Sequence, residues 1–195
     1  PVSDKVAQGL LARVIYEDEG LMVVNKPSGI AVHGGSGVAY GLIEGLRAAT
    51  GKKYLELIHR IDRDTSGLVM ISKKRSTLKT LQDLLHEHKI QKTYAAIVKG
   101  QVSLDKQLID APLHRYELAN GERRVRVSKE GKASKTQWNV AERFMHASLV
   151  YASPLSGRTH QIRVHGLSIG HPLVGDDKYG HQTEYRGPAP RRLCL

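Results

Sequence analysis

Cysteine is almost absent from this chain of 195 residues, which contains only Cys194. A single thiol cannot form a disulfide within the chain, so no intrachain cross-link is expected. A chain that does without disulfides fits a reducing compartment. We therefore expect a cytoplasmic location.

Long apolar stretches are also missing. A helix that spans a bilayer needs about 20 consecutive apolar residues, and no run in this sequence approaches that length. Residues 1–9 are polar and lack the apolar segment of a secretory signal. We expect no membrane-spanning segment.

Acidic residues are few relative to basic ones. Nineteen Asp and Glu stand against 30 Lys and Arg, which gives a net charge of +11 and an isoelectric point near 9.8. Such an excess favours a polyanionic partner, and nucleic acid is the commonest. An anionic membrane surface is the alternative partner.

Several common site motifs are missing or incomplete. The ten histidines and one cysteine form no H-E-x-x-H or C-x-x-C pattern, so no metal site is predicted. Gly45 to Lys53 departs from the spacing of a phosphate-binding P-loop. Gly166-Leu167-Ser168-Ile169-Gly170 matches the serine-hydrolase G-x-S-x-G, but the preceding residues have a helical pattern where that motif needs a strand. A helix end is the better interpretation.

The apolar pattern predicts alternating strands and helices without an internal repeat or a necessary domain boundary. Residues 40–49 have helical spacing, and residues 68–71 predict a strand buried on both faces. Ser76 and Thr159 are the expected N-caps of helices ending near Lys89 and Gly170. Further strands are predicted in residues 13–25, 90–99 and 134–153.

The most unusual stretch is the charged segment from His59 to Leu68, with two carboxylates, two guanidiniums and an imidazole between apolar flanks. A turn between two strands explains the Asp, Thr, Ser and Gly residues. Buried charge is costly unless it is paired or used. Arginines on either side of Asp62 would keep its carboxylate ionised, which suits a nucleophile or base better than a general acid.

A second basic segment covers residues 115–135. Arg124-Val125-Arg126-Val127 alternates, so both arginines are expected on one face of a strand. Either a solvated hairpin or a ribbon along a phosphate backbone fits this pattern, and the overall charge favours the ribbon.

Four segments in order resemble the motifs of the RluA-type pseudouridine synthases, and they span nearly the whole chain. The central motif is His59-Arg60-Ile61-Asp62-Arg63-Asp64-Thr65-Ser66-Gly67. The other segments are residues 24–29 (VNKPSG), 92–94 (KTY) and 157–165 (GRTHQIRVH). Residues 31–37, 45–47 and 121–128 are in addition similar to a family member that modifies large-subunit ribosomal RNA.

The resemblance implies an α+β fold with a mixed, mostly antiparallel central sheet and flanking helices. It implies that Asp62 attacks the target uridine, that Tyr94 packs on the base and that Arg163 pairs with Asp62. Arg60 would fill the gap left by an extruded base. Arg124 and Arg126 are expected to bind RNA, together with the motif residues His59, Arg158 and His160.

The resemblance also implies isomerisation of uridines in RNA, 23S ribosomal RNA above all, by a monomeric enzyme without metal or cofactor. Residues 1–195 would form the catalytic domain, without the S4-like RNA-binding domain of such relatives and with the end of the fold truncated. Two alternatives stay open: a relative acting on tRNA or another rRNA site, and a non-catalytic RNA-binding module.

Overall fold

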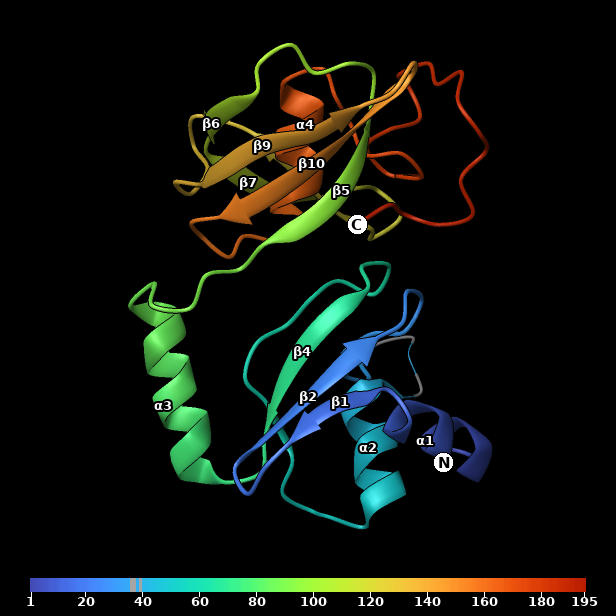
Figure 1. Ribbon diagram of the computed structural model, residues 1–195, viewed down its shortest axis with the longest axis vertical. Coiled ribbons are helices and arrows are strands. Elements are labelled where there is room, and N and C mark those ends of the chain that lie inside the picture. Colours follow the sequence, from blue (N-terminus) through green and yellow to red (C-terminus); the bar gives the residue numbers. More distant parts are fainter. Residues whose placement is uncertain (36–37, 39) are drawn as a thin grey trace. The chain divides into compact units, whose positions relative to one another are not determined.

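The computed structural model describes all residues except 36, 37 and 39, and it divides the chain into two compact units, Pro1–Ile90 and Gln91–Leu195. Part of the resemblance to the large-subunit enzymes, at residues 36 and 37, therefore lies outside the described residues. Helices and antiparallel strand pairs occur in both units (Figure 1). The α+β class is confirmed.

The first unit contains a four-stranded sheet in the order β1-β2-β4-β3, with every pair antiparallel. The hairpin predicted in residues 13–25 is present, and α2 fills the predicted helical segment. In Figure 1, α1 and α2 lie side by side against this sheet. The elements of the unit are α1 (Asp4–Leu11), β1 (Val14–Glu17), β2 (Leu21–Lys26), α2 (Leu42–Thr50), β3 (Glu56–Leu57), β4 (Gly67–Ser72) and α3 (Arg75–His86).

Two details of the first unit differ from the prediction. β4 is not buried on both faces, because Leu68 is 58% exposed while Val69 and Ile71 are fully buried. The N-cap of α3 is Lys74, one residue after Lys73, and Ser76 lies inside the helix. The Lys73 amide donates to the Gly20 carbonyl, so contacts with the β1–β2 turn fix where the helix begins.

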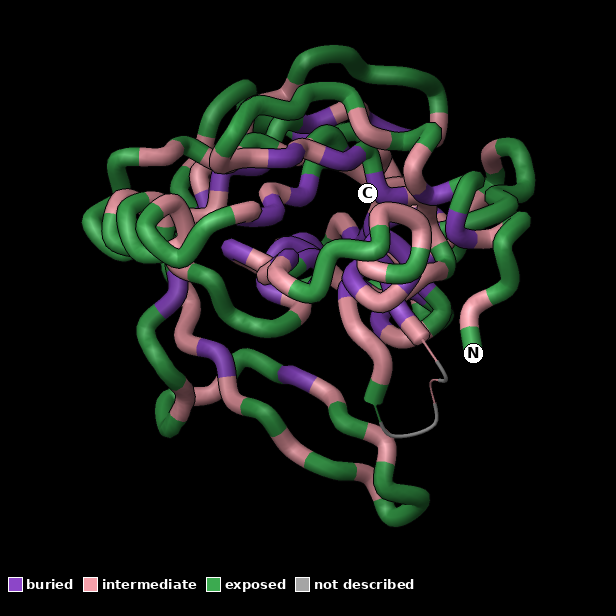
Figure 2. Tube along the Cα trace, turned by 90° about the horizontal axis from the view of Figure 1, so that it is seen from below, coloured by how far each residue is buried: buried purple, intermediate pink, exposed green. Residues whose placement is uncertain are grey.

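The second unit contains the sheet β5-β10-β9-β6 and the hairpin β7-β8, again with antiparallel pairs only. Buried residues alternate with less buried ones along β5 and in the first half of β9, and Figure 2 shows buried and exposed positions interleaved along the chain. A buried cluster around Trp138 and Leu173 forms its core. The elements are β5 (Tyr94–Lys99), β6 (Lys106–Asp110), β7 (Leu113–Glu117), β8 (Arg123–Val127), β9 (Lys135–Arg143), β10 (Ala147–Pro154) and α4 (Gln161–Ser168).

Helix α4 packs against β8, β9 and β10 and is buried from Gln161 to Gly166. Its N-cap is His160 and not the predicted Thr159. The Gln161 side chain accepts hydrogen bonds from the Arg158 amide and the Ser156 hydroxyl, which orders the turn before the helix. Ser168 is the last helical residue, so the G-x-S-x-G match is a helix end.

Candidate active site

Asp62 begins a tight turn between β3 and β4. The Thr65 amide donates to the Asp62 carbonyl at 3.1 Å, and Asp is a favoured residue in this first turn position. The Asp62 side chain is half-buried. Asp64, in the same turn, forms an ion pair at 3.2 Å with the exposed Arg63. The two carboxylates thus have different surroundings.

A fully buried lysine, Lys26, is hydrogen-bonded to the backbone of the Asp62 turn. The Lys26 ammonium donates to the carbonyls of Pro27, Ile30 and Arg63 at 2.8, 2.6 and 2.9 Å. Two further bonds join the same segments: the Ser28 hydroxyl donates to the Asp64 carbonyl, and the Gly29 amide donates to the Arg63 carbonyl. These bonds hold the turn through its backbone carbonyl groups. None of these bonds involves the Asp62 carboxylate.

His59 and Arg60 come just before the turn. His59 Nε2 accepts the Met70 amide at 3.0 Å, so this nitrogen carries no proton and the ring is tied to β4. Arg60 is exposed. Its place on the surface beside Asp62 is compatible with RNA contact, whereas His59 has at least a structural function.

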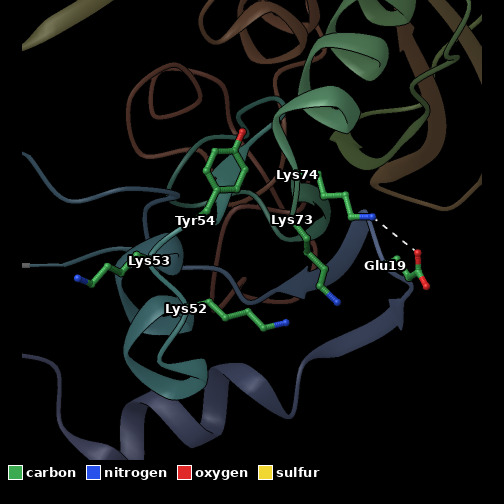
Figure 3. Close-up of a pocket in the computed structure, with 6 residues that line it drawn as sticks. All are labelled: Glu19, Lys52, Lys53, Tyr54, Lys73 and Lys74. Carbon is green, nitrogen blue, oxygen red and sulfur yellow. Dashed lines mark ion pairs between the residues drawn. The ribbon is translucent and has the colours of Figure 1, made fainter.

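A basic pocket of about 550 Å³ lies elsewhere in the first unit, lined by Glu19, Lys52, Lys53, Tyr54, Lys73 and Lys74. In Figure 3, Lys74 extends toward Glu19, with which it pairs at 3.7 Å. Lys73 pairs with Glu17 and donates to the Asp18 carbonyl. Glu17 at the end of β1 and Glu19 in the following turn already bind the ammoniums of Lys73 and Lys74, so the cluster joins the β1–β2 hairpin to the start of α3.

In the second unit, α4 presents Arg163, whose side chain is 3% exposed. Its Nε and Nη2 donate to the two oxygens of Asp176 at 2.8 and 2.7 Å. Burial by itself would raise the pKa of Asp176, but the bonds and charge of Arg163, together with bonds from the Tyr179 and Lys178 amides, hold that pKa below its ordinary value. The pair is ionised and fixed in one plane.

His160 lies at the start of the same helix with φ of 53°, a left-handed conformation that is strained for a residue other than glycine. Its Nδ1 lies 2.6 Å from the Tyr179 hydroxyl. That hydroxyl also accepts a hydrogen bond from the Val125 amide. Burial raises the pKa of Tyr179 to about 12.

Two other predicted residues of this unit lie at its surface or edge. Tyr94 begins β5, is half-buried and packs against the core cluster. Arg158 is exposed and donates to the Ala133 carbonyl at 3.2 Å. It also lines a pocket of about 520 Å³ with several other basic side chains, namely His114, Arg115 and Lys132.

The two arginines predicted to bind RNA on β8 differ from each other. Both line a pocket of about 340 Å³ beside α4. Arg124 is bound by the Glu122 carboxylate and donates to the Lys178 carbonyl at 2.9 Å. Arg126 is exposed and lies over the Tyr116 ring, 5.0 Å from its centroid. Arg126 is thus the better candidate for contact with a phosphate.

The predicted catalytic residues belong to both units: Asp62 to the first, Tyr94 and Arg163 to the second. The pairing of Asp62 with Arg163 stays a prediction. Sequence reasoning missed Asp176 and Tyr179, which it placed in a tail without any periodic pattern. The residue that could have pointed to this segment is Gly175, just before Asp176. Its φ is 82°, and any Cβ there would collide with the Arg192 carbonyl oxygen, so only glycine fits.

Two kinds of feature do not occur among the described residues. No three His, Cys, Asp or Glu side chains gather there as a metal site would require. None of the helices in the described part of the chain is long and apolar enough to cross a membrane.

Comparison with known proteins decides the family. The model of the family described as RNA pseudouridylate synthase matches residues 20–168. The chain belongs to the RNA pseudouridylate synthase family. The matched residues include the Asp62 turn, Tyr94 and Arg163, while Asp176 and Tyr179 follow them.

Curated members of this family from bacteria are similar over nearly the whole chain. Ribosomal large subunit pseudouridine synthase C of Yersinia pestis is 53% identical over 196 residues, which are 98% of this chain and 61% of the relative. The enzyme of that name from Escherichia coli K12 is 52% identical over 201 residues, covering 100% and 63%. The predicted similarity to this member is confirmed, and the chain spans about six tenths of these relatives.

Solved structures of two human family members have the same fold. Human RNA Pseudouridylate Synthase Domain Containing 1 aligns with a TM-score of 0.78 at 26% identity, covering 93% of this chain and 74% of that one. Human RNA Pseudouridylate Synthase Domain Containing 4 aligns with a TM-score of 0.76 at 27% identity, covering 96% and 76%.

Proposed function

We propose that residues 1–195 form the catalytic domain of a cytoplasmic, monomeric enzyme that isomerises uridines to pseudouridine in 23S ribosomal RNA. The observation that carries this proposal is the Asp62 turn, held by Lys26 within the motif of the family. The relatives at 52 and 53% identity, whose names specify the large ribosomal subunit, support the substrate.

In the proposed reaction, Asp62 attacks the target uridine, at the ribose anomeric carbon or at the base. The glycosidic bond breaks, the uracil rotates, a carbon–carbon bond forms between its C5 and the anomeric carbon, the bond to Asp62 breaks, and N1 takes up a proton. A proton then leaves C5, for which Tyr94 is the candidate base. Reactant and product have the same atoms and oxidation state, so the scheme requires neither a redox cofactor nor a co-substrate.

The other residues of the site have supporting roles in this proposal. Arg163 orients the ionised Asp62 carboxylate, and Arg60 fills the gap left when the base is extruded from its stack. Arg126 and the pocket around Arg158 offer positive charge for the phosphate backbone. Such phosphate contacts position RNA without specifying its sequence.

The test is release of tritium from 23S RNA labelled at C5 of uridine, followed by mapping of the product. We expect turnover by the wild type, loss of detectable turnover in Asp62→Asn, and RNA affinity within about threefold of wild type. Asp64→Asn is the matched control, because that carboxylate lies on the same turn but pairs with Arg63. Turnover by Asp62→Asn at the wild-type rate would refute the assignment of Asp62 as the nucleophile.

The same assay separates the alternatives. Product in tRNA or in another ribosomal RNA, with none in 23S RNA, would identify a different substrate for the same chemistry. RNA binding by the wild type without tritium release from any of these RNAs would indicate a binding module.

A further inference from the structure

Asp176 is the most fully bonded carboxylate near a proposed catalytic residue. It accepts two bonds from Arg163 and two more, each 3.0 Å long, from the amides of Lys178 and Tyr179. Its side chain is 0% exposed. Because it is buried in this way, Asp176 cannot itself contact an RNA ligand.

The bidentate pairing fixes the direction of the Arg163 guanidinium. A guanidinium has five N–H donors in one plane, and Asp176 takes one from Nε and one from Nη2. The direction of the remaining three donors follows from that pairing. The Arg163 guanidinium carbon also lies over the Tyr179 ring, 5.2 Å from the ring centroid.

The same short segment also holds a second predicted site residue. The Tyr179 hydroxyl is hydrogen-bonded to Nδ1 of His160, whose backbone has a left-handed conformation. A buried ion pair contributes little net stability compared with a well-packed apolar pair. Stability alone is thus a weak reason for placing a charged pair at this position.

We propose that Asp176 is a positioning residue, which fixes the orientation of the Arg163 guanidinium for its part in the proposed reaction. The inference rests on the proposed function of Arg163. Asp176 lies after the residues that match the family model and outside the four motifs that carry the resemblance. It would act on the rate of the chemical step through Arg163 and leave RNA affinity unchanged.

The first test is Asp176→Asn under single-turnover conditions with C5-tritiated 23S RNA. Misplacing a catalytic group by about 1 Å can cost about 100-fold in rate, so we expect a loss near that size at saturating enzyme. RNA affinity should stay within about threefold. Ser148→Ala is the matched control, because it removes a buried side chain with two hydrogen bonds in the same unit. We expect its rate to equal that of wild type.

A double-mutant cycle with Arg163→Lys shows whether Asp176 acts through Arg163. A lysine lacks the planar fork, so adding Asp176→Asn to Arg163→Lys should slow the reaction less than about threefold further. A wild-type rate in Asp176→Asn would overturn the inference. So would a double variant in which the two losses multiply in full.

A measurement independent of activity follows the pair directly. In ¹⁵N-resolved NMR spectra, the Arg163 Nε–H signal, assigned by its absence in Arg163→Lys, should be protected from exchange in wild type and lose protection in Asp176→Asn. Protection that persists in the variant would overturn the inference. If Asp176→Asn lacks the native circular dichroism spectrum, Asp176→Glu replaces it in every arm.

These outcomes separate the inference from the proposed function. Absence of tritium release by the wild-type protein would refute the proposed function and, with it, the positioning role of Asp176. Wild-type activity together with an unaffected Asp176→Asn variant would refute only the positioning role.

Discussion

At the scale of single residues, charged side chains with similar sequence contexts have different surroundings. Asp62 is half-buried at the start of its turn, while Asp64 is paired with Arg63. Arg163 is buried and bidentate, while Arg158, five residues earlier, is exposed. Substituting one residue of each pair, Asp62 and Asp64 or Arg163 and Arg158, should therefore affect a different property of the protein from substituting the other.

Arg163→Lys tests this difference. An ammonium cannot make both bonds to Asp176, so we expect the free energy of unfolding to fall by about 1–3 kcal/mol. Tritium release should fall at least about tenfold. The control, Arg158→Lys, should change the free energy of unfolding by less than about 0.5 kcal/mol in urea denaturation. A fully active Arg163→Lys variant would contradict the proposed pairing with Asp62.

At the scale of elements, β8 combines one arginine engaged within the protein and one that is exposed. We expect the double variant Arg124→Gln/Arg126→Gln to weaken RNA binding and to flatten its salt dependence. On the scale known for duplex DNA, each phosphate contact adds about 0.9 to the slope of log affinity against log salt concentration. Arg126→Gln alone should account for most of the change. Titrations at several salt concentrations measure the slope, and an unchanged slope would mean that β8 does not face RNA.

The junction of α4 and β9 predicts a pH dependence of stability. His165 donates from Nε2 to the Ala111 carbonyl and lies 2.7 Å from the Thr136 hydroxyl. Burial is the largest influence and lowers the pKa of His165 below its ordinary value of 6.5, although the bond to Ala111 opposes it. Between the folded pKa and 6.5, only the unfolded chain binds the proton. The free energy of unfolding should therefore fall as pH drops below about 6.5, by at most about 1.4 kcal/mol per pH unit.

Urea denaturation between about pH 5 and 7.5 measures this dependence. His165→Gln should remove the part of the slope due to this ring, whereas His181→Gln, at an exposed position, should keep it. A slope of the same size in wild type and His165→Gln would assign the effect to other groups.

Element types were largely predictable from the sequence, while their ends were not. The hairpin of β1 and β2 and helix α2 follow directly from apolar spacing and turn residues. The ends of α3 and α4 depend on partners distant in sequence or on the backbone of the turn. The Gly20 carbonyl, for example, accepts a hydrogen bond from the amide of Lys73, the residue before the N-cap Lys74. Local capping preferences could not reveal such partners. The Arg163–Asp176 pair was hidden for the same reason, since it joins α4 to a segment without periodicity.

At the scale of the whole molecule, the chain has two compact units with separate sets of internal contacts. Trp138, the only tryptophan, is fully buried in the second unit, so its fluorescence reports on that unit. We expect Leu46→Ala, in the core of the first unit, to lower the free energy of unfolding of that unit by about 2–5 kcal/mol.

Circular dichroism and tryptophan fluorescence can be followed together in urea. The circular dichroism transition of Leu46→Ala should shift, while the Trp138 transition should stay within about 0.5 kcal/mol of wild type. Val150→Ala, in the core of the second unit, should move the fluorescence transition instead. Equal shifts of both signals in each variant would show that the units unfold as one block.

The three carbonyl groups that bind the Lys26 ammonium determine how the Asp62 turn responds to the ions of its buffer. Three inward-facing carbonyl oxygens resemble the coordination shell of a monovalent cation, with the ammonium in the place of the ion. Because this cation is covalently tethered to β2, it cannot be chelated, diluted or exchanged. The shape of the turn that presents Asp62 should therefore be the same in potassium, sodium or chelator-treated buffer.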